Sequence, residues 1–148
     1  MRRRTVRSSL VAATLVLLIG CLPKEKPKIE GWQNLRVHYL EIVCLDVAAR
    51  CAALEKAHGL SFRPAVADLG HARIAEASDG SQIGVRAPLA EHEQPIVRTY
   101  LEVDDIARAV KQAESAGAVI AYPPTQQGDT GTWAIYILGD VQIGLWQR

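Results

Sequence analysis

The sequence lacks most of the patterns that assign a chain to a class at sight. No heptad repeat is sustained, which argues against a coiled coil, and no long stretch lacks apolar residues, which argues against extensive disorder. A glycine-rich phosphate-binding loop, a Gly-x-Ser-x-Gly motif and zinc-ligand spacing are all absent. Phe and Met occur once each, and aromatic residues make up 5% of the chain. The 148 residues, of which 49% are hydrophobic, suit one globular domain.

Positive charge is also scarce outside the N-terminus. The chain has 17 Lys and Arg against 16 Asp and Glu, but four of the arginines lie within the first seven residues. Without those four the balance is 13 against 16, which gives a net charge of −3. A mildly acidic protein of this kind lacks the basic face that a nucleic-acid partner requires.

The N-terminal arginines precede an uncharged apolar run at residues 10–20. Its 11 residues are too few to span a bilayer as a helix, which takes about 20. A basic start followed by such a run is typical of a secretory signal peptide. The end of the run, Leu18-Ile19-Gly20-Cys21, resembles the bacterial lipobox. The resemblance implies cleavage after residue 20 and lipidation of Cys21, and the alternative is an ordinary signal peptide that contains a cysteine by chance.

Residues 21–34 contain two prolines and three lysines and have too few apolar side chains to build a core. They are expected to form a flexible, semi-extended tether. The sequence therefore predicts a signal peptide at residues 1–20, a lipid anchor and tether at residues 21–34, and a folded domain at residues 35–148. The implied location is the bacterial cell envelope, with the domain facing the periplasm or the exterior.

The domain consists of two similar halves, residues 35–87 and 95–148, joined by a polar linker bounded by prolines. Tyr39-Leu40-Glu41-Ile42 matches Tyr100-Leu101-Glu102-Val103, and Gln82-Ile83-Gly84-Val85 matches Gln142-Ile143-Gly144-Leu145. Each half predicts a strand, a helix and three shorter strands. The helices are expected to begin after Asp46 and Asp105 and to end at Gly59 and Gly117. The predicted strands are residues 37–44, 61–66, 72–77 and 82–86, and then 96–103, 119–122, 132–138 and 141–147.

This repeated βαβββ order resembles the vicinal oxygen chelate superfamily, which includes glyoxalase I, extradiol dioxygenases and bleomycin-binding proteins. The resemblance implies an α+β fold in which two modules form an open, barrel-like mixed sheet that cups a ligand, with the helices outside. Period-two alternation directs Leu40, Ile42, Cys44, Leu101 and Val103 toward the helices. The predicted lining of the cup is Tyr39, Glu41, Gln82, Gly84, Arg86, Arg98, Tyr100, Glu102, Gln142, Gly144 and Trp146.

Metal-dependent members of the superfamily take one ligand from the first strand of each module, usually His, and one from the last strand, usually Glu. Here Gly84 and Gly144 stand at the last-strand positions. Counting seven residues back from each capping Asp places Tyr39 and Arg98 at the first-strand positions. Aligning the Tyr-Leu-Glu runs instead gives His38 and Thr99. Neither register leaves enough ligands for a divalent ion, so no metal, cofactor or catalytic residue is expected.

The cup can still bind a small polar or aromatic molecule by stacking and charge-assisted hydrogen bonds. In a second reading, Glu41, Glu102, Arg86 and Arg98 pair with one another as a polar plug. A third is an enzyme with a relocated site, using Glu41, Glu102 or His38 as base. A fourth is an envelope interaction module, its cup closed by a partner or by homodimerisation.

The remaining candidates carry weaker signals. His38, His58, His71 and His92 are scattered and are expected at the surface without a functional partner. Cys44 and Cys51 are expected either to form a disulfide or to be two small buried residues, and the sequence leaves both open. Trp133 and Trp146 lie in the last two predicted strands, one expected in the core and the other in the cup.

Overall fold

The structure is a computed structural model, and it describes residues 35–148. The predicted signal peptide, the lipidation of Cys21 and the tether lie outside these residues. Within residues 35–148, no helix is long and apolar enough to cross a membrane.

The first module begins with strand β1 (Val37–Val43) and helix α1 (Val47–His58), followed by a short 3₁₀ helix η1 (Ala67–Leu69) and strands β2 (Arg73–Glu76) and β3 (Gln82–Arg86). The second module comprises β4 (Ile96–Glu102), α2 (Ile106–Ser115), β5 (Val119–Gln126), β6 (Thr132–Leu138) and β7 (Val141–Gln147). The order predicted from the sequence is confirmed, with one strand missing from the first module.

The missing strand is the one predicted at residues 61–66. One backbone hydrogen bond ties this segment to β2, from Arg63 N to Ile74 O, and an isolated bridge joins Val66 to Ala72, the residue before β2. The carbonyl oxygen of Phe62 instead accepts a hydrogen bond of 3.0 Å from the side chain of Arg73. Pro64 has no N–H to donate. The segment therefore crosses the end of the sheet as irregular backbone that buries Phe62 in the core.

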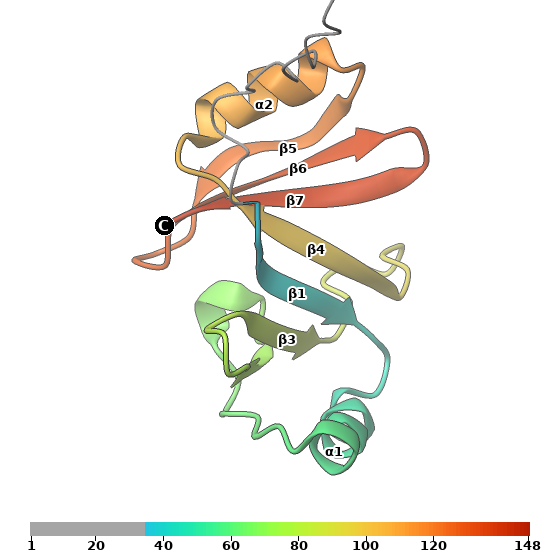
Figure 1. Cartoon of the computed structure of the whole chain (residues 1–148). Helices are drawn as coiled ribbons and strands as arrows, with labels where there is room; N and C mark the ends of the chain where they lie inside the picture. Colours follow the sequence, from blue (N-terminus) through green and yellow to red (C-terminus); the bar gives the residue numbers. More distant parts are fainter. Residues whose placement is uncertain (1–34) are drawn as a thin grey trace, which may run out of the picture.

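The seven strands form one mixed sheet in the order β2-β3-β1-β4-β7-β6-β5. The two modules meet where β1 pairs antiparallel with β4 at the centre of the sheet (Figure 1). On either side of this junction each first strand pairs parallel with the last strand of its own module, β1 with β3 and β4 with β7. This is the open sheet that the sequence predicts, with α1 beside β3 and α2 against β5, β6 and β7.

The helices begin where their capping residues place them. The carboxylates of Asp46 and Asp105 accept hydrogen bonds of 2.9 Å from the backbone N–H groups of Ala49 and Arg108, respectively. Each bond satisfies a backbone donor in the first turn of the helix. Helix α1 ends at Gly59, whose φ of 67° is left-handed. Helix α2 ends one residue earlier than predicted, with Ala116 as its cap and Gly117 next at φ 92°.

Buried side chains gather in three clusters. Helix α2 packs on a cluster that includes Val103, Ala134 and Leu145, and α1 packs on a smaller one that includes Cys51 and Val85. The third cluster contains Tyr39, Tyr100 and Trp146. As predicted, Ile42, Cys44, Leu101 and Val103 belong to the helix side of the sheet. The aromatic cluster therefore forms the floor of the concave side.

Candidate functional site

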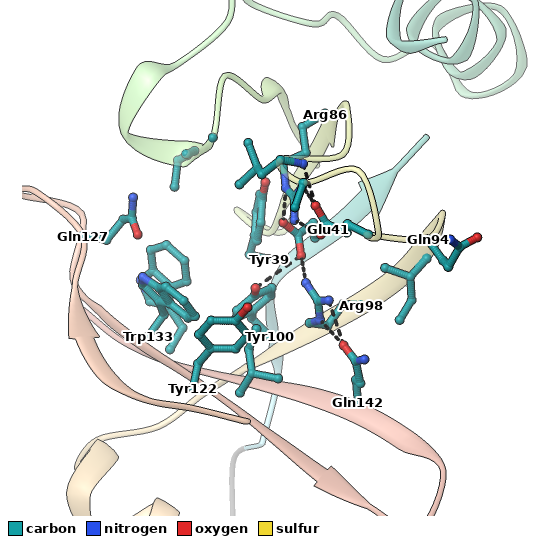
Figure 2. A pocket seen from close by; sticks show the side chains of 18 of the residues that line it. Tyr39, Glu41, Arg86, Gln94, Arg98, Tyr100, Tyr122, Gln127, Trp133 and Gln142 are labelled. Carbon is teal, nitrogen blue, oxygen red and sulfur yellow. Dashed lines mark hydrogen bonds and ion pairs between the residues drawn. The ribbon is translucent and has the colours of Figure 1, made fainter. Parts of the chain in front are cut away.

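A cavity of about 570 Å³ lies on the concave side of the sheet, between the two modules and the linker that joins them. Its size falls within the range of small-molecule sites, about 300–1,000 Å³. Seven of the side chains predicted to line the cup do line this cavity: Tyr39, Glu41, Arg86, Arg98, Tyr100, Gln142 and Trp146, all but the last labelled in Figure 2.

Aromatic side chains are concentrated here. The chain has one Phe, three Trp and four Tyr, of which seven lie within residues 35–148, and five of these seven line this cavity. Tyr39, Tyr100 and Trp146 form the buried floor, with ring centroids 5.5–5.9 Å apart. Tyr122 and Trp133 form a second pair at 5.7 Å, and Tyr122 is 56% exposed. The floor is held by its own packing, whereas the second pair offers an accessible aromatic surface.

A buried carboxylate ties the two modules together above the floor. Glu41, which is 6% exposed, accepts from Arg86 Nε at 2.6 Å and from Arg98 Nη1. Tyr100 donates its hydroxyl to the same carboxylate at 3.3 Å. Arg98 also holds the side-chain oxygen of Gln142, at 2.8 Å from Nη2. The predicted polar plug is thus present in part, because Glu41 satisfies both buried arginines (Figure 2).

The linker supplies a second carboxylate. Residues 87–95, called the strap below, cross one side of the cavity, and Glu93 binds Arg86 in a bidentate manner at 2.7 and 2.8 Å. The carboxylate of Glu93 also accepts from Leu89 N at 2.7 Å, which folds the strap on itself. The hydrogen bonds from Arg86 lower the pKa of Glu93 to about 2, although partial burial opposes this. Arg86 is therefore held between two carboxylates.

Two tyrosine rings lie directly over the two glycines of the last strands. A Cβ atom on Gly84 would lie 2.6 Å from Cε2 of Tyr39, and one on Gly144 would lie 2.6 Å from Cε1 of Tyr100. Contacts between Cβ atoms and their neighbours are essentially never this short. Glycine is thus required at both positions, because the rings use the space a side chain would fill.

Strand register decides between the two alignments of the first strands. Glu41 pairs with Gly84 in the first module, and Tyr100 pairs with Gly144 in the second. Glu41 is therefore the structural equivalent of Tyr100, and Tyr39 that of Arg98, as counting from the capping aspartates predicts. The Tyr-Leu-Glu runs, similar as they look, are offset from this equivalence by two residues.

The residues at these positions do not fit a divalent metal. The four positions that the family resemblance assigns to ligands hold Tyr39, Gly84, Arg98 and Gly144, of which two have no side chain and one is a cation. Burial, and then the nearby Glu41, raise the pKa of Tyr39, so its hydroxyl stays protonated and is a poor ligand. No group of three or more His, Cys, Asp or Glu within residues 35–148 is placed to hold an ion.

Four residues predicted in the cup lining do not line the cavity, and the prediction for them is wrong: Gly84 and Gly144, which the two tyrosine rings cover, and Gln82 and Glu102. Gln82 pairs with Tyr39, whose ring leans along β3 over Gly84 and leaves Gln82 behind it. Glu102 lies beyond Trp146 and pairs with Arg36 and with Arg148, the latter at 2.6 Å. Alternation assigned the correct face of the sheet to both, but the large rings of Tyr39 and Trp146 end the cavity before these residues.

The histidines are placed separately. His58, His71 and His92 are exposed, as expected. His38 is 8% exposed, so the expectation of a surface residue is wrong. A bulge in β1 turns it toward Trp146, at a ring distance of 5.4 Å, and its Nδ1 lies 4.0 Å from Glu102. Burial lowers the pKa of His38.

Cys44 and Cys51 are free thiols in the structure, and both are buried. The sequence left open a disulfide or two small buried residues, and the structure has the second. Both tryptophans of the last strands, Trp133 and Trp146, line the cavity.

Two residues of the site, Glu93 and Tyr122, were not predicted from the sequence. The only signal was for Glu93, an acidic residue in a linker too short to lie far from either module.

No protein-family model matches the chain, and no curated protein does so. Solved structures do match, at low sequence identity. A hypothetical protein from Bacillus halodurans C-125 superposes with a TM-score of 0.65 at 11% identity, over 78% of this chain and 96% of that protein. Methylmalonyl-CoA epimerase from Mycobacterium tuberculosis gives 0.59 at 18% identity, over 76% of this chain and 87% of that one.

A Ser-to-Thr variant of the methylmalonyl-CoA epimerase of Streptomyces coelicolor, in complex with 2-nitronate-propionyl-CoA, gives a TM-score of 0.57 at 16% identity, over 76% of this chain and 94% of that one. Methylmalonyl-CoA epimerase is a member of the vicinal oxygen chelate superfamily. The element order, the sheet topology and these superpositions agree: the chain has the vicinal oxygen chelate fold.

Proposed function

We propose that this protein is a metal-free, non-catalytic binding domain that takes a small polar or aromatic molecule in the cavity on the concave side of its sheet. The observation that carries the proposal is the gathering of five of the seven aromatic side chains of residues 35–148 around one cavity of about 570 Å³. A fold without a ligand has no need to leave an aromatic pair such as Tyr122 and Trp133 facing open space.

Several observations favour binding over catalysis. Glu41, the strongest candidate for a base, is engaged by Arg86, Arg98 and Tyr100, so its oxygens are occupied by donors. The other candidates, Glu102 and His38, do not line the cavity. The fold neighbours are named for an epimerase of a coenzyme A ester. The ligand positions that the family resemblance assigns are not kept in this chain, so we do not extend that activity to it.

We further propose that Cys21 is lipidated and tethers the domain to the bacterial envelope. This rests on the basic start, the apolar run and the Leu18-Ile19-Gly20-Cys21 sequence. Closure of the cup by a partner protein or by a second copy of the chain is the competing use of the same surface. The arginines that line the cavity are already paired within it, which favours a small molecule over a partner protein as the occupant.

The test is a thermal-melting screen of the full chain against a library of small aromatic compounds. A ligand that binds only the folded state raises the midpoint in a concentration-dependent way. The variant Tyr122→Ala removes the exposed ring and is expected to abolish the shift. Val119→Ala, on the same strand, is 67% exposed and outside the cavity, so the shift should persist. Absence of any concentration-dependent shift contradicts the proposal.

A further inference from the structure

The two arginines that line the cavity, Arg86 and Arg98, are already paired with other lining residues. Three carboxylates also line it: Glu41, Glu93 and the exposed Asp68. Arg86 donates from Nε to Glu41 and from both Nη atoms to Glu93. Arg98 donates from Nη1 to Glu41 and from its other two nitrogens to the side-chain oxygen of Gln142. No surplus of positive charge is left to attract an anion.

An anionic ligand would have to displace one of these carboxylates. Displacing Glu41 would leave a carboxylate that is 6% exposed without its partners, which is strongly unfavourable. Displacing Glu93 would replace a bidentate partner of Arg86 that is held in the same chain by a carboxylate from solution. It would also break the hydrogen bond from Leu89 N to Glu93. In either case the ligand's charge brings no net gain, because one ion pair is only exchanged for another.

Uncharged polar groups, in contrast, are available. Within residues 35–148 the hydroxyl of Tyr39 makes no hydrogen bond, and its raised pKa keeps it a donor. The side-chain oxygen of Gln142 is held by Arg98, so its amide nitrogen is the part of that group left to donate. Beside these donors stand the rings of Tyr122 and Trp133. Neutral donors next to an accessible aromatic pair suit a flat ring that carries a hydrogen-bond acceptor.

We propose that the ligand of this cavity is an aromatic compound that carries a hydrogen-bond acceptor and no anionic group, and that Glu93 is the residue that excludes carboxylates by occupying Arg86. This inference rests on the proposed function and narrows its ligand class. The strap therefore acts as a specificity element, because it carries a carboxylate to the place where a ligand's carboxylate would bind.

The test compares two probes that share one ring system and differ in charge, naphthalene-2-carboxamide and naphthalene-2-carboxylate. Calorimetric titration of the full chain at pH 7 is expected to show the amide binding at least about tenfold more tightly than the carboxylate. A smaller preference for the amide, or tighter binding of the carboxylate, overturns the inference and leaves the proposed function standing. No saturable binding of either probe overturns both.

The role of Glu93 is tested with Glu93→Gln, which keeps the shape and removes the charge. This variant is expected to bind the carboxylate probe about tenfold more tightly than the wild type does, because Arg86 regains an unpaired charge. The matched control is Glu91→Gln, on the same strap but outside the cavity, and it should bind as the wild type does. Unchanged carboxylate affinity in Glu93→Gln overturns the assignment of Glu93 as the excluding residue.

Discussion

The ring of Tyr39 lies across the backbone of Gly84 and uses the space that any larger side chain at that position would need. The same relationship recurs between Tyr100 and Gly144 in the second module. In each module a glycine stands at the last-strand position where the family resemblance expects a metal-binding carboxylate, and a tyrosine ring covers that glycine. The aromatic floor thus occupies the space that a carboxylate side chain at either position would need.

Gly84→Ala tests this relationship directly. Alanine in place of a strand glycine ordinarily gains about 0.5–1 kcal/mol, but here the new methyl group would overlap Tyr39 and cost about 1–3 kcal/mol. Denaturant unfolding measures the change. In a Tyr39→Ala background the same substitution should be neutral or stabilising, and a double-mutant cycle isolates the coupling. A stabilising Gly84→Ala in the wild-type background would contradict the overlap.

Glu41→Gln is expected to be strongly destabilising, by about 3–5 kcal/mol, because it leaves two buried arginines without their shared carboxylate. The matched control is Glu102→Gln. The partners of Glu102, Arg36 and Arg148, have side chains 46% and 59% exposed, so that change should cost about 0–1 kcal/mol. Urea unfolding of both variants provides the comparison. Equal effects would show that Glu41 does not hold the modules together.

The pH dependence of stability should carry the signature of Glu93. Its pKa is lowered from 4.5 to about 2 in the folded protein, so its contribution is fully present above pH 4.5 and is lost as the pH falls toward 2. The difference in unfolding free energy between wild type and Glu93→Gln should therefore shrink over this interval. A constant gap for Glu93→Gln would mean that Arg86 does not hold this carboxylate in solution.

Cys21→Ser tests the envelope anchor. If Cys21 carries the lipid, the wild-type protein fractionates with membranes in a bacterial host, and the variant is released into the soluble fraction. Mass spectrometry of the purified wild type should show a mature chain that begins at residue 21 with acyl chains attached. Recovery of the wild type in the soluble fraction without added mass would contradict the anchor.

The fold could be predicted largely because its signals are local and repeated. Asp46 and Asp105 cap their helices as the sequence indicates, and counting back from them gives the register that the strands adopt. The repeated Tyr-Leu-Glu run gives the wrong equivalence, because the strand pairings make Glu41, and not Tyr39, the equivalent of Tyr100. Local sequence similarity and structural equivalence differ here by two residues.

The site was harder to predict than the fold. Alternation places Glu102 and Gln82 on the concave face, but the extent of the cavity depends on where Trp146 and Tyr39 direct their rings, and one strand's pattern does not contain that information. Glu93 reaches Arg86 from a linker with no periodicity, and Tyr122 comes from an edge strand with an almost wholly exposed pattern. Both contacts depend on tertiary packing.

The central claim is that the cavity binds an aromatic molecule without a metal, and one measurement tests it most directly. The compound that raises the melting midpoint most in the library screen is titrated into the full chain by calorimetry. One titration contains EDTA, and four others contain an excess of Mg²⁺, Mn²⁺, Ni²⁺ and Zn²⁺, one metal in each. We predict saturable binding with the same affinity in all five conditions. Binding that disappears in EDTA and returns with one of the metals would contradict the account.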